Sequence, residues 1–403
     1  MDGLRSPLST MRVALVHYWL VEMRGGEKVL EAFARMFPNA DIFTLVCDHD
    51  KLSPTLRRHR VTTSFLQKIP GATKSYTQLL PLMPFALEQF DLRSYDLVIS
   101  SESGPAKGVV TRPDAFHLCY CHTPMRYMWD HYHEYYESAG RLARIGMSLT
   151  GPLIRNWDVN SAARVDHFVA NSNHVARRIR RYWRRNAEVI YPPVAVDHFT
   201  PGTAKSDFYL VAGQLVSYKR VDLAVRAFTA MNKKLVVIGG GPEEKFLRNI
   251  AGPSVSFLGR QPDHVLKDHF QRCRALVFPG EEDFGIVPVE AMAAGRPVIG
   301  YARGGLLETV SSPEYGTLFD EQSVEALTNA VESFEKREPS FDPAAIRRGA
   351  MRFDEASFER RIRQTLERRL FPDHAGDEAV FDARSGDVRA TSSREPRMAA
   401  IHE

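Results

Sequence analysis

The chain has 403 residues, of which 44% are hydrophobic, so it can bury a large core and form two domains of ordinary size. Its net charge of +4 is too small to indicate a nucleic-acid-binding protein, and its four cysteines lack the spacing of a disulfide framework or a metal site. No apolar run approaches the roughly 20 residues of a membrane-spanning helix. Residues 1–10 lack the apolar segment of a signal peptide, and we expect a cytoplasmic protein.

Short apolar runs alternate with helical patterns along the chain, which predicts parallel sheets covered by helices. In the first half the runs are 12–17, 41–46, 96–100, 116–121, 166–171 and 187–191. After Pro192 and Pro193 the alternation restarts, with runs at 208–213, 234–239, 255–259, 274–279 and 297–301. Consecutive prolines forbid a helix and stiffen the connection. The sequence thus predicts two α/β domains in tandem, with a binding cleft between them.

The first predicted strand leads into a loop with Gly25 and Gly26, and a helical pattern follows. Glycines let the backbone approach a ligand closely, and a helix start offers N–H donors to an anion. A turn that merely needs a positive φ is the alternative.

Three histidines follow the predicted strand 116–121. His122 comes directly after it and should face the cleft, because ligands bind beyond the carboxyl ends of parallel strands. A zinc site formed with His131 and His133 is the alternative, but the three lack the i, i+4 pairing of familiar zinc motifs.

Residues 174–186 form a basic amphipathic helical pattern. Its arginines include Arg177, Arg178, Arg181 and Arg184. Such a face fits anionic lipid headgroups or a polyanionic acceptor, whereas nucleic acid is disfavoured because no nucleic-acid motif accompanies it. A merely solvated face is the other alternative. The apolar residues of 140–154 could add a docking surface, but we expect them in the core.

Lys219 and Arg220 follow the first predicted strand of the second half. An ammonium group there can neutralise a leaving diphosphate, and the alternative is a solvated pair of surface charges.

Glu282 and Glu290 bracket the start of a predicted helix at 288–295, after the strand 274–279. The helix start suits a phosphate, while one carboxylate can hold hydroxyls beside that anion and the other can reach groups further along. Two polyols that flank a diphosphate describe a nucleotide-sugar. Acidic residues that only complement the helix dipole are the alternative.

Together, GGEKVLEAF, YCHTPMRYMWD, YPPV, GQLVSYKRVDLAV and PGEEDFGIVPVEAMAAGRPVIGYARGGLLETV resemble the pattern of glycosyltransferase family 4 over roughly residues 11–371. The similarity is greatest to the bacterial mannosyltransferase-like branch that builds polysaccharides. The resemblance implies an α/β fold of the GT-B type, with two Rossmann-like domains, an interdomain cleft and a final helix that returns to the N-terminal domain. We accordingly expect an acceptor domain at 11–192, a nucleotide-sugar donor domain at 193–352, the returning helix at 353–371 and a disordered tail at 372–403.

The resemblance also implies roles for single residues. Glu282 would hold the hydroxyls of the transferred sugar, Glu290 the ribose and Lys219 the diphosphate. The remaining assignments are backbone N–H groups of Phe284, Gly285 and Ile286 for sugar and phosphate, Gly25 and Gly26 at the reacting centre, His122 for the donor sugar, and Arg260 in the base pocket. Many relatives have arginine where Gln214 stands, and Arg220 would replace that cation.

The expected function is hexose transfer with retention, with mannose from GDP-mannose as donor and a polyprenyl-diphosphate-linked glycan as acceptor. No metal or other cofactor is expected, and the enzyme would lie peripherally on the cytoplasmic face of the inner membrane. A nucleotide-sugar epimerase of the same fold and a non-catalytic glycan- or nucleotide-binding partner are the alternatives.

Overall fold

The computed structural model describes residues 7–202 and 205–372. The described residues divide into two units, one that ends at Arg361 and contains both sheets and a second that begins at Ile362. Within the second unit the described residues, 362–372, include the end of helix α14 (Glu355–Leu370). The predicted tail at 372–403 lies outside the described residues, except for its first member.

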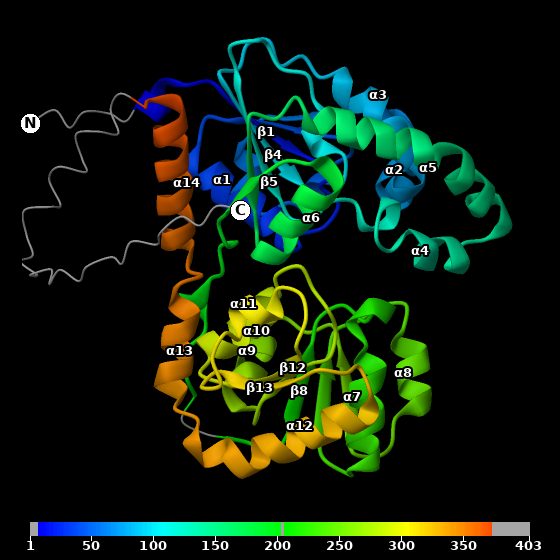
Figure 1. The fold of residues 1–403 in the computed structure, drawn as a ribbon, viewed down its shortest axis with the longest axis vertical. Coiled ribbons are helices and arrows are strands. Elements are labelled where there is room, and N and C mark those ends of the chain that lie inside the picture. Colours follow the sequence, from blue (N-terminus) through cyan, green and yellow to red (C-terminus); the bar gives the residue numbers. More distant parts are fainter. Residues whose placement is uncertain (1–6, 203–204, 373–403) are drawn as a thin grey trace, which may run out of the picture. The chain divides into compact units, whose positions relative to one another are not determined.

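A seven-stranded parallel sheet forms from the first half of the chain, in the order β3-β2-β1-β4-β5-β6-β7 (Figure 1). Its strands are β1 (Val13–His17), β2 (Asp41–Thr44), β3 (Val61–Thr63), β4 (Leu97–Glu102), β5 (Phe116–Cys121), β6 (His167–Ala170) and β7 (Ala187–Val189). Every residue of β1 and β4 is buried, as expected for strands covered by helices on both faces. The strand order reverses between β1 and β4, and ligands of open α/β sheets bind at such a reversal.

The helices of this half are α1 (Gly25–Met36), α2 (Ala72–Ser75), α3 (Met83–Glu88), α4 (Tyr132–Ser138), α5 (Arg141–Ala162) and α6 (Asn173–Trp183). Helix α6 begins where the hydroxyl of Ser172 accepts the N–H of Val175, a typical N-cap. The core prediction for 140–154 is wrong for its large apolar residues, because Leu142, Ile145, Leu149 and Leu153 are exposed. None of the helices in the described ranges has the length and hydropathy needed to cross a bilayer.

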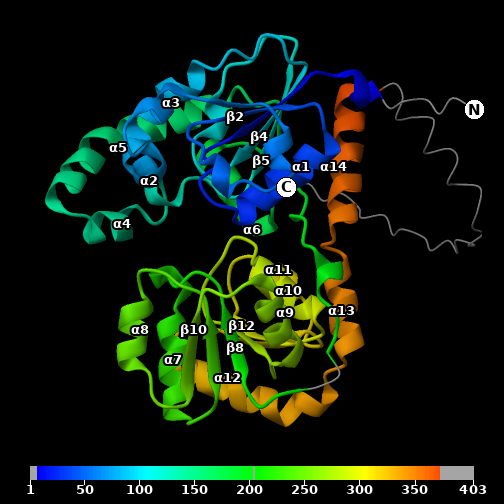
Figure 2. The same cartoon turned by 180° about the vertical axis from the view of Figure 1, so that it is seen from behind.

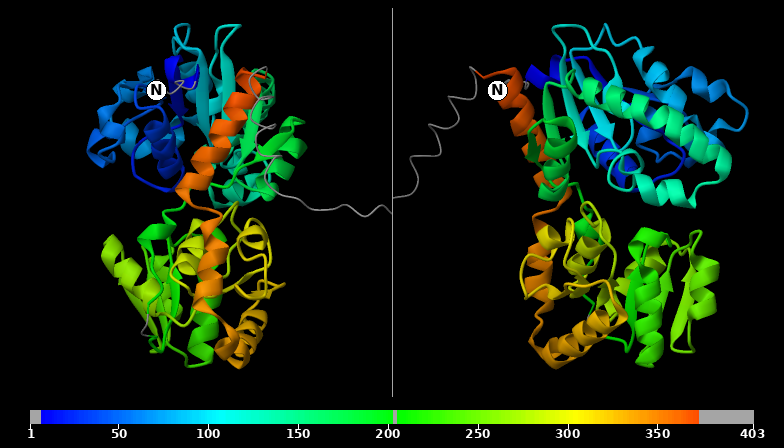
Figure 3. Two further views of the ribbon diagram at one scale, coloured as in Figure 1. Left: turned by 90° about the vertical axis from the view of Figure 1, so that its left-hand side faces the viewer. Right: turned by 45° about the vertical axis from the view of Figure 1, so that its right-hand side comes forward.

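The second half forms a six-stranded parallel sheet in the order β10-β9-β8-β11-β12-β13 (Figure 2). Its strands are β8 (Tyr209–Ala212), β9 (Leu235–Ile238), β10 (Val255–Gly259), β11 (Leu276–Phe278), β12 (Val298–Tyr301) and β13 (Gly316–Phe319). Its helices are α7 (Val221–Ala230), α8 (Glu244–Ile250), α9 (Asp263–Arg272), α10 (Ile286–Ala293), α11 (Leu306–Thr309), α12 (Val324–Arg337) and α13 (Pro343–Met351). Each sheet, taken by itself, lies between layers of helices, and two hydrophobic clusters fill the two faces of this one (Figure 3). All four cysteines are buried free thiols.

The start of α14 packs against the N-terminal sheet, as the fold prediction requires. The ring of Phe358 lies 5.4 Å from that of Phe33 on α1 and 5.6 Å from that of Tyr120 on β5. Glu355 pairs with Arg35 at 3.0 Å. Two buried aromatic contacts therefore fix the point at which the chain returns.

A buried ionic cluster lies at the end of β4. Lys107 forms a short ion pair with Asp158, and its Nζ lies 3.8 Å from Oε1 of Glu102. Asp158 also accepts the indole N–H groups of Trp129 and Trp183, at 2.9 and 2.7 Å. Burial raises the pKa of Glu102 to about 8, although Lys107 partly offsets this effect. Asp158 is thus the main partner of the ammonium group, and Glu102 holds a proton near neutral pH.

Glu102→Gln should flatten the dependence of stability on pH. Between pH 4.5, the usual pKa, and about pH 8 the folded protein holds a proton that the unfolded chain releases, so the native state loses stability as the pH rises. We expect urea unfolding of the parent to show a loss of more than about 1 kcal/mol between pH 5 and pH 8, since one pKa unit corresponds to about 1.4 kcal/mol. Glu314→Gln, at an exposed site, should behave like the parent. An equally steep loss in Glu102→Gln would contradict this assignment.

Candidate active site

A cleft of about 830 Å³ lies at the carboxyl ends of strands from both sheets. Ligand sites of enzymes commonly have this size and position. It is lined by most of the predicted catalytic and donor-binding residues: Gly25, Gly26, His122, Lys219, Glu282, Phe284, Gly285, Ile286 and Glu290. Residues far apart in the sequence thus form one site.

The loop between β11 and α10 carries the predicted phosphate-binding groups. Gly285, with a φ of +85°, takes the left-handed conformation that favours glycine, and α10 begins directly after it. The first turn of a helix leaves N–H groups without partners inside the helix, and here they border the cleft. The helix begins two residues before the predicted range, and Glu290 lies about one turn inside it.

Lys219 and Glu282 contact one another directly. The Lys219 Nζ lies 2.8 Å from the Glu282 Oε1, and both side chains are largely buried. Burial lowers the pKa of Lys219, but the Glu282 carboxylate outweighs this effect, so the pKa of the ammonium group is raised overall. A Cβ on Gly280 would lie 2.6 Å from the Lys219 Cα, which shows how closely the two loops pack. Packing and charge together hold an ammonium group and a carboxylate side by side in the cleft.

Glu290 also lines the cleft and is 8% exposed. Burial raises the pKa of this carboxyl group, and Lys28, 3.6 Å away on α1, partly offsets the shift. Sequence reasoning missed Lys28, although it stands two residues after Gly26. A carboxylate in this position can accept hydrogen bonds from two neighbouring hydroxyl groups of a ligand.

His122 and Gly26 form the opposing wall. The His122 Nε2 lies 2.8 Å from the hydroxyl of Ser101, and burial lowers the pKa of the imidazole to about 3, so it is neutral. A Cβ on Gly26 would lie 2.4 Å from the hydroxyl of Tyr18 and 3.6 Å from the His122 Nε2. Any side chain at position 26 would force the Tyr18 hydroxyl to move. A neutral imidazole can exchange hydrogen bonds with a sugar hydroxyl without adding charge.

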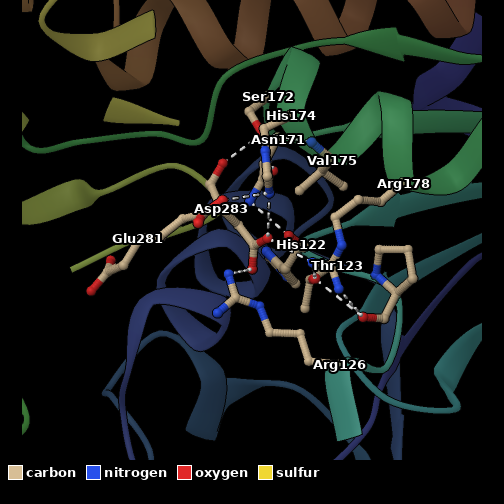
Figure 4. Close-up of polar contacts among 12 residues, drawn as sticks. His122, Thr123, Arg126, Asn171, Ser172, His174, Val175, Arg178, Glu281 and Asp283 are labelled. Atoms are coloured by element: carbon tan, nitrogen blue, oxygen red, sulfur yellow. Dashed lines mark hydrogen bonds and ion pairs between the residues drawn. The ribbon is translucent and has the colours of Figure 1, made fainter. Parts of the chain in front are cut away.

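The sequence prediction missed Asp283, a residue at the centre of the polar contacts (Figure 4). Its carboxylate pairs with Arg126 and with Arg178, each at 2.8 Å, and its carbonyl accepts the Ser172 hydroxyl at 2.6 Å. Burial raises the pKa of Asp283, but the two guanidinium groups outweigh burial and hold it below its usual value. Because Asp283 follows Glu282 and precedes Phe284, these contacts fix the loop that carries the predicted donor-binding groups.

One member of the predicted arginine surface is misassigned. Arg178 is only 7% exposed and binds Asp130 at 2.6 Å as well as Asp283, so it cannot face a membrane. Residues three or four positions apart share one face of a helix, and Arg178 lies on the face of α6 that points to the protein interior. Arg177, Arg181 and Arg184 are exposed.

Two predicted donor-binding residues do not line the cleft. The Arg220 guanidinium binds Asp222 at 3.1 Å, two positions along the chain. Arg260 is 69% exposed in its side chain and pairs with Glu22 at 2.9 Å. The hypothesis that Arg220 replaces the arginine absent at Gln214 is therefore not supported. Arg126 does line the cleft and is an additional cation there.

His131 pairs with Glu134 at 2.8 Å, at the edge of the same cleft. Within residues 7–202 and 205–372, no group of three or more His, Cys, Asp or Glu side chains is arranged to hold a metal ion. The zinc alternative thus has no geometric support in the described residues.

Comparison with solved structures defines the fold class. The Anabaena protein HepE, solved in complex with UDP and glucose, matches 89% of this chain and 99% of its own length, with a TM-score of 0.66 and 17% sequence identity. The two sheets therefore have the GT-B fold. The family models agree, because glycosyltransferase family 4 matches residues 23–198 and glycosyl transferases group 1 matches residues 197–350. The chain belongs to glycosyltransferase family 4.

Two curated relatives have narrower names. The D-inositol 3-phosphate glycosyltransferase of Mycobacteroides abscessus is 29% identical over 48% of this chain and 47% of the relative. A GDP-mannose-dependent alpha-(1-6)-phosphatidylinositol monomannoside mannosyltransferase of Mycolicibacterium smegmatis is 27% identical over 40% of this chain and 53% of the relative. The chain thus matches about half the length of these relatives.

Proposed function

We propose that the enzyme transfers mannose from GDP-mannose, with retention, to a polyprenyl-diphosphate-linked glycan used in cell-surface polysaccharide synthesis. It would act in the cytoplasm, peripherally on the inner membrane. The observation that carries the proposal is the joint placement of Lys219, Glu282 and Glu290 around the start of α10 in one cleft. An ammonium group and free N–H donors suit the diphosphate, and two carboxylates suit the hydroxyls on either side.

The proposed reaction proceeds at one face of the sugar. The bond from the anomeric carbon to the diphosphate breaks while the acceptor hydroxyl forms its bond to that carbon, and the departing phosphate oxygen takes the acceptor proton. Lys219 and the amides of residues 284–286 stabilise the negative charge that builds on the diphosphate, which is usually the largest contribution to such catalysis. Glu282 and neutral His122 hold the sugar. The scheme assigns no step to a metal ion.

The name of the Mycolicibacterium relative supports GDP-mannose, whereas the HepE structure contains UDP. A thermal-shift panel of GDP, UDP, ADP and their sugar derivatives therefore tests the donor, since a ligand that binds the native state raises the melting temperature. We expect the largest shift with GDP-mannose. A response to UDP compounds alone would overturn the donor assignment. An isomerised sugar after incubation with the donor alone would indicate an epimerase.

Glu290→Gln should weaken GDP binding by about tenfold and leave kcat nearly unchanged. The charged acceptor of a ribose hydrogen bond is lost, and such a bond contributes about 1.5 kcal/mol. Calorimetry with GDP measures the affinity, and saturation with donor gives kcat. Glu281→Gln, beside the cleft but outside its lining, is the matched control and should bind like the parent. Equal GDP affinity in Glu290→Gln would remove this residue from the nucleotide site.

A further inference from the structure

Helix α5 exposes an unbroken apolar stripe along its first three turns. Its members recur at three- and four-residue spacing and therefore lie on one side of the helix. They are Leu142, Ile145, Leu149 and Leu153, which are 87%, 58%, 70% and 70% exposed. Single exposed apolar residues are common on proteins, but a continuous stripe of four large ones marks an interaction surface.

The charge of the segment that carries the stripe favours a lipid surface. Residues 139–157 contain Arg141, Arg144 and Arg155 and no aspartate or glutamate. Arg141 is exposed beside the stripe. A second copy of the chain docked on the same stripe would bring like charges together, whereas a bilayer with anionic headgroups supplies both an apolar phase and the opposite charge.

The stripe lies one helix away from the catalytic cleft. Helices α4 and α5 lie side by side (Figure 1), and the Arg155 guanidinium stacks 4.9 Å from the ring centre of Tyr132 on α4. On α4, Glu134 and Tyr135 line the cleft. A molecule anchored in a lipid phase beneath α5 therefore needs to cross only α4 to reach the reacting centre.

We propose that the stripe of α5 docks this enzyme on the surface of an anionic bilayer, with α5 lying in the interface. The docking surface is then α5, and the exposed arginines on α6 and just after it, Arg177, Arg181 and Arg184, are only a secondary electrostatic contact. This inference deepens the proposed function and rests on it only for the lipid-linked acceptor, because binding itself depends on the stripe.

The test is sedimentation of the full chain with vesicles of phosphatidylcholine, with and without phosphatidylglycerol. The stripe variant carries Leu142→Ser, Ile145→Ser, Leu149→Ser and Leu153→Ser. Because these side chains are exposed, the fold should survive, which thermal melting checks. We expect binding to phosphatidylglycerol vesicles to fall at least about tenfold, since every methylene withdrawn from the interface weakens binding. The matched control, Phe246→Ser with Leu258→Ser, removes exposed apolar residues elsewhere and should bind like the parent.

A second variant carries Arg177→Ser and Arg181→Ser on α6 and Arg184→Ser just after it, and we expect this variant to retain most of the binding. Full binding by the stripe variant, no binding by the parent, or loss of binding only in the arginine variant would each overturn the proposal. The proposal would also be overturned if the parent formed a dimer that is lost in the stripe variant and did not bind vesicles. GDP affinity is measured on the same samples to separate the two proposals. If the parent and every variant fail to bind GDP while the parent still binds vesicles, the proposed donor is contradicted and the docking proposal stands.

Discussion

Lys219→Ala should lower kcat by about two orders of magnitude. The ammonium group is the charged side chain of the cleft that is best placed to meet the developing charge of a diphosphate, and a charge-assisted hydrogen bond contributes roughly 1.5–3 kcal/mol. The substitution also leaves the Glu282 carboxylate without its cation in a largely buried place. The loss should therefore appear in kcat with donor at saturation, and less in donor affinity.

Two further variants isolate the effect of Lys219. The double variant Lys219→Ala with Glu282→Gln removes the uncompensated carboxylate, and any stability lost in the single variant should return. Arg220→Gln removes the neighbouring cation, which binds Asp222 outside the cleft lining, and should keep the parent kcat. An unchanged rate for Lys219→Ala would exclude it from the reaction, and a large loss in Arg220→Gln would restore that residue to the diphosphate site.

Asp283→Asn should both destabilise the protein and slow the reaction. The substitution keeps the size of the side chain but leaves two largely buried guanidinium groups without their shared carboxylate, and breaking such a pair costs about 3 kcal/mol. The loop that carries Glu282 and the amides of residues 284–286 then loses its anchor. Since a displacement of about 1 Å can cost up to a hundredfold in rate, kcat should fall roughly tenfold to a hundredfold.

The loss of folding stability at acid pH gives an independent measure of how much Asp283 stabilises the protein. Its pKa is lowered in the folded protein, so its stabilising contribution is present above pH 3.8, the usual value, and is lost as the pH falls through the lower folded value. Asp283→Asn should lose less stability over that range than the parent. Asp130→Asn is the control, because it removes the other carboxylate bound to Arg178 and leaves the loop contact in place. Parent-like kcat and stability in Asp283→Asn would contradict the anchoring role.

The sequence could predict most strands because strands buried on both faces appear as continuous apolar runs. Strands β3 and β13 were missed, since Val61–Thr63 is short and half-buried, and Gly316–Phe319 is short and begins with glycine, a residue depleted in strands. Residues that directly follow a strand, such as His122, could be placed at the cleft from strand direction alone.

The rest of the site depends on contacts between distant segments. Arg126 and Arg178 lie in the first half of the chain and meet Asp283 in the second, and no local periodicity reports such a pairing. The same limit explains the error at Arg178, because a helical pattern shows which residues share a face but not which charge another segment will neutralise. The apolar face of α5 was assigned to the core for a related reason, since amphipathicity does not reveal whether a partner covers it.

The contact between Lys219 and Glu282 has a consequence for ligand choice. A bare anion that attracts the ammonium group leaves the carboxylate unsatisfied, and a neutral sugar that attracts the carboxylate leaves the ammonium group unsatisfied. A molecule that carries both an anionic group and sugar hydroxyls can satisfy both Lys219 and Glu282 when it separates the two side chains. Under the proposed function, free nucleotide and free monosaccharide would each bind more weakly than the intact nucleotide-sugar, and loss of the sugar would favour release of the nucleotide.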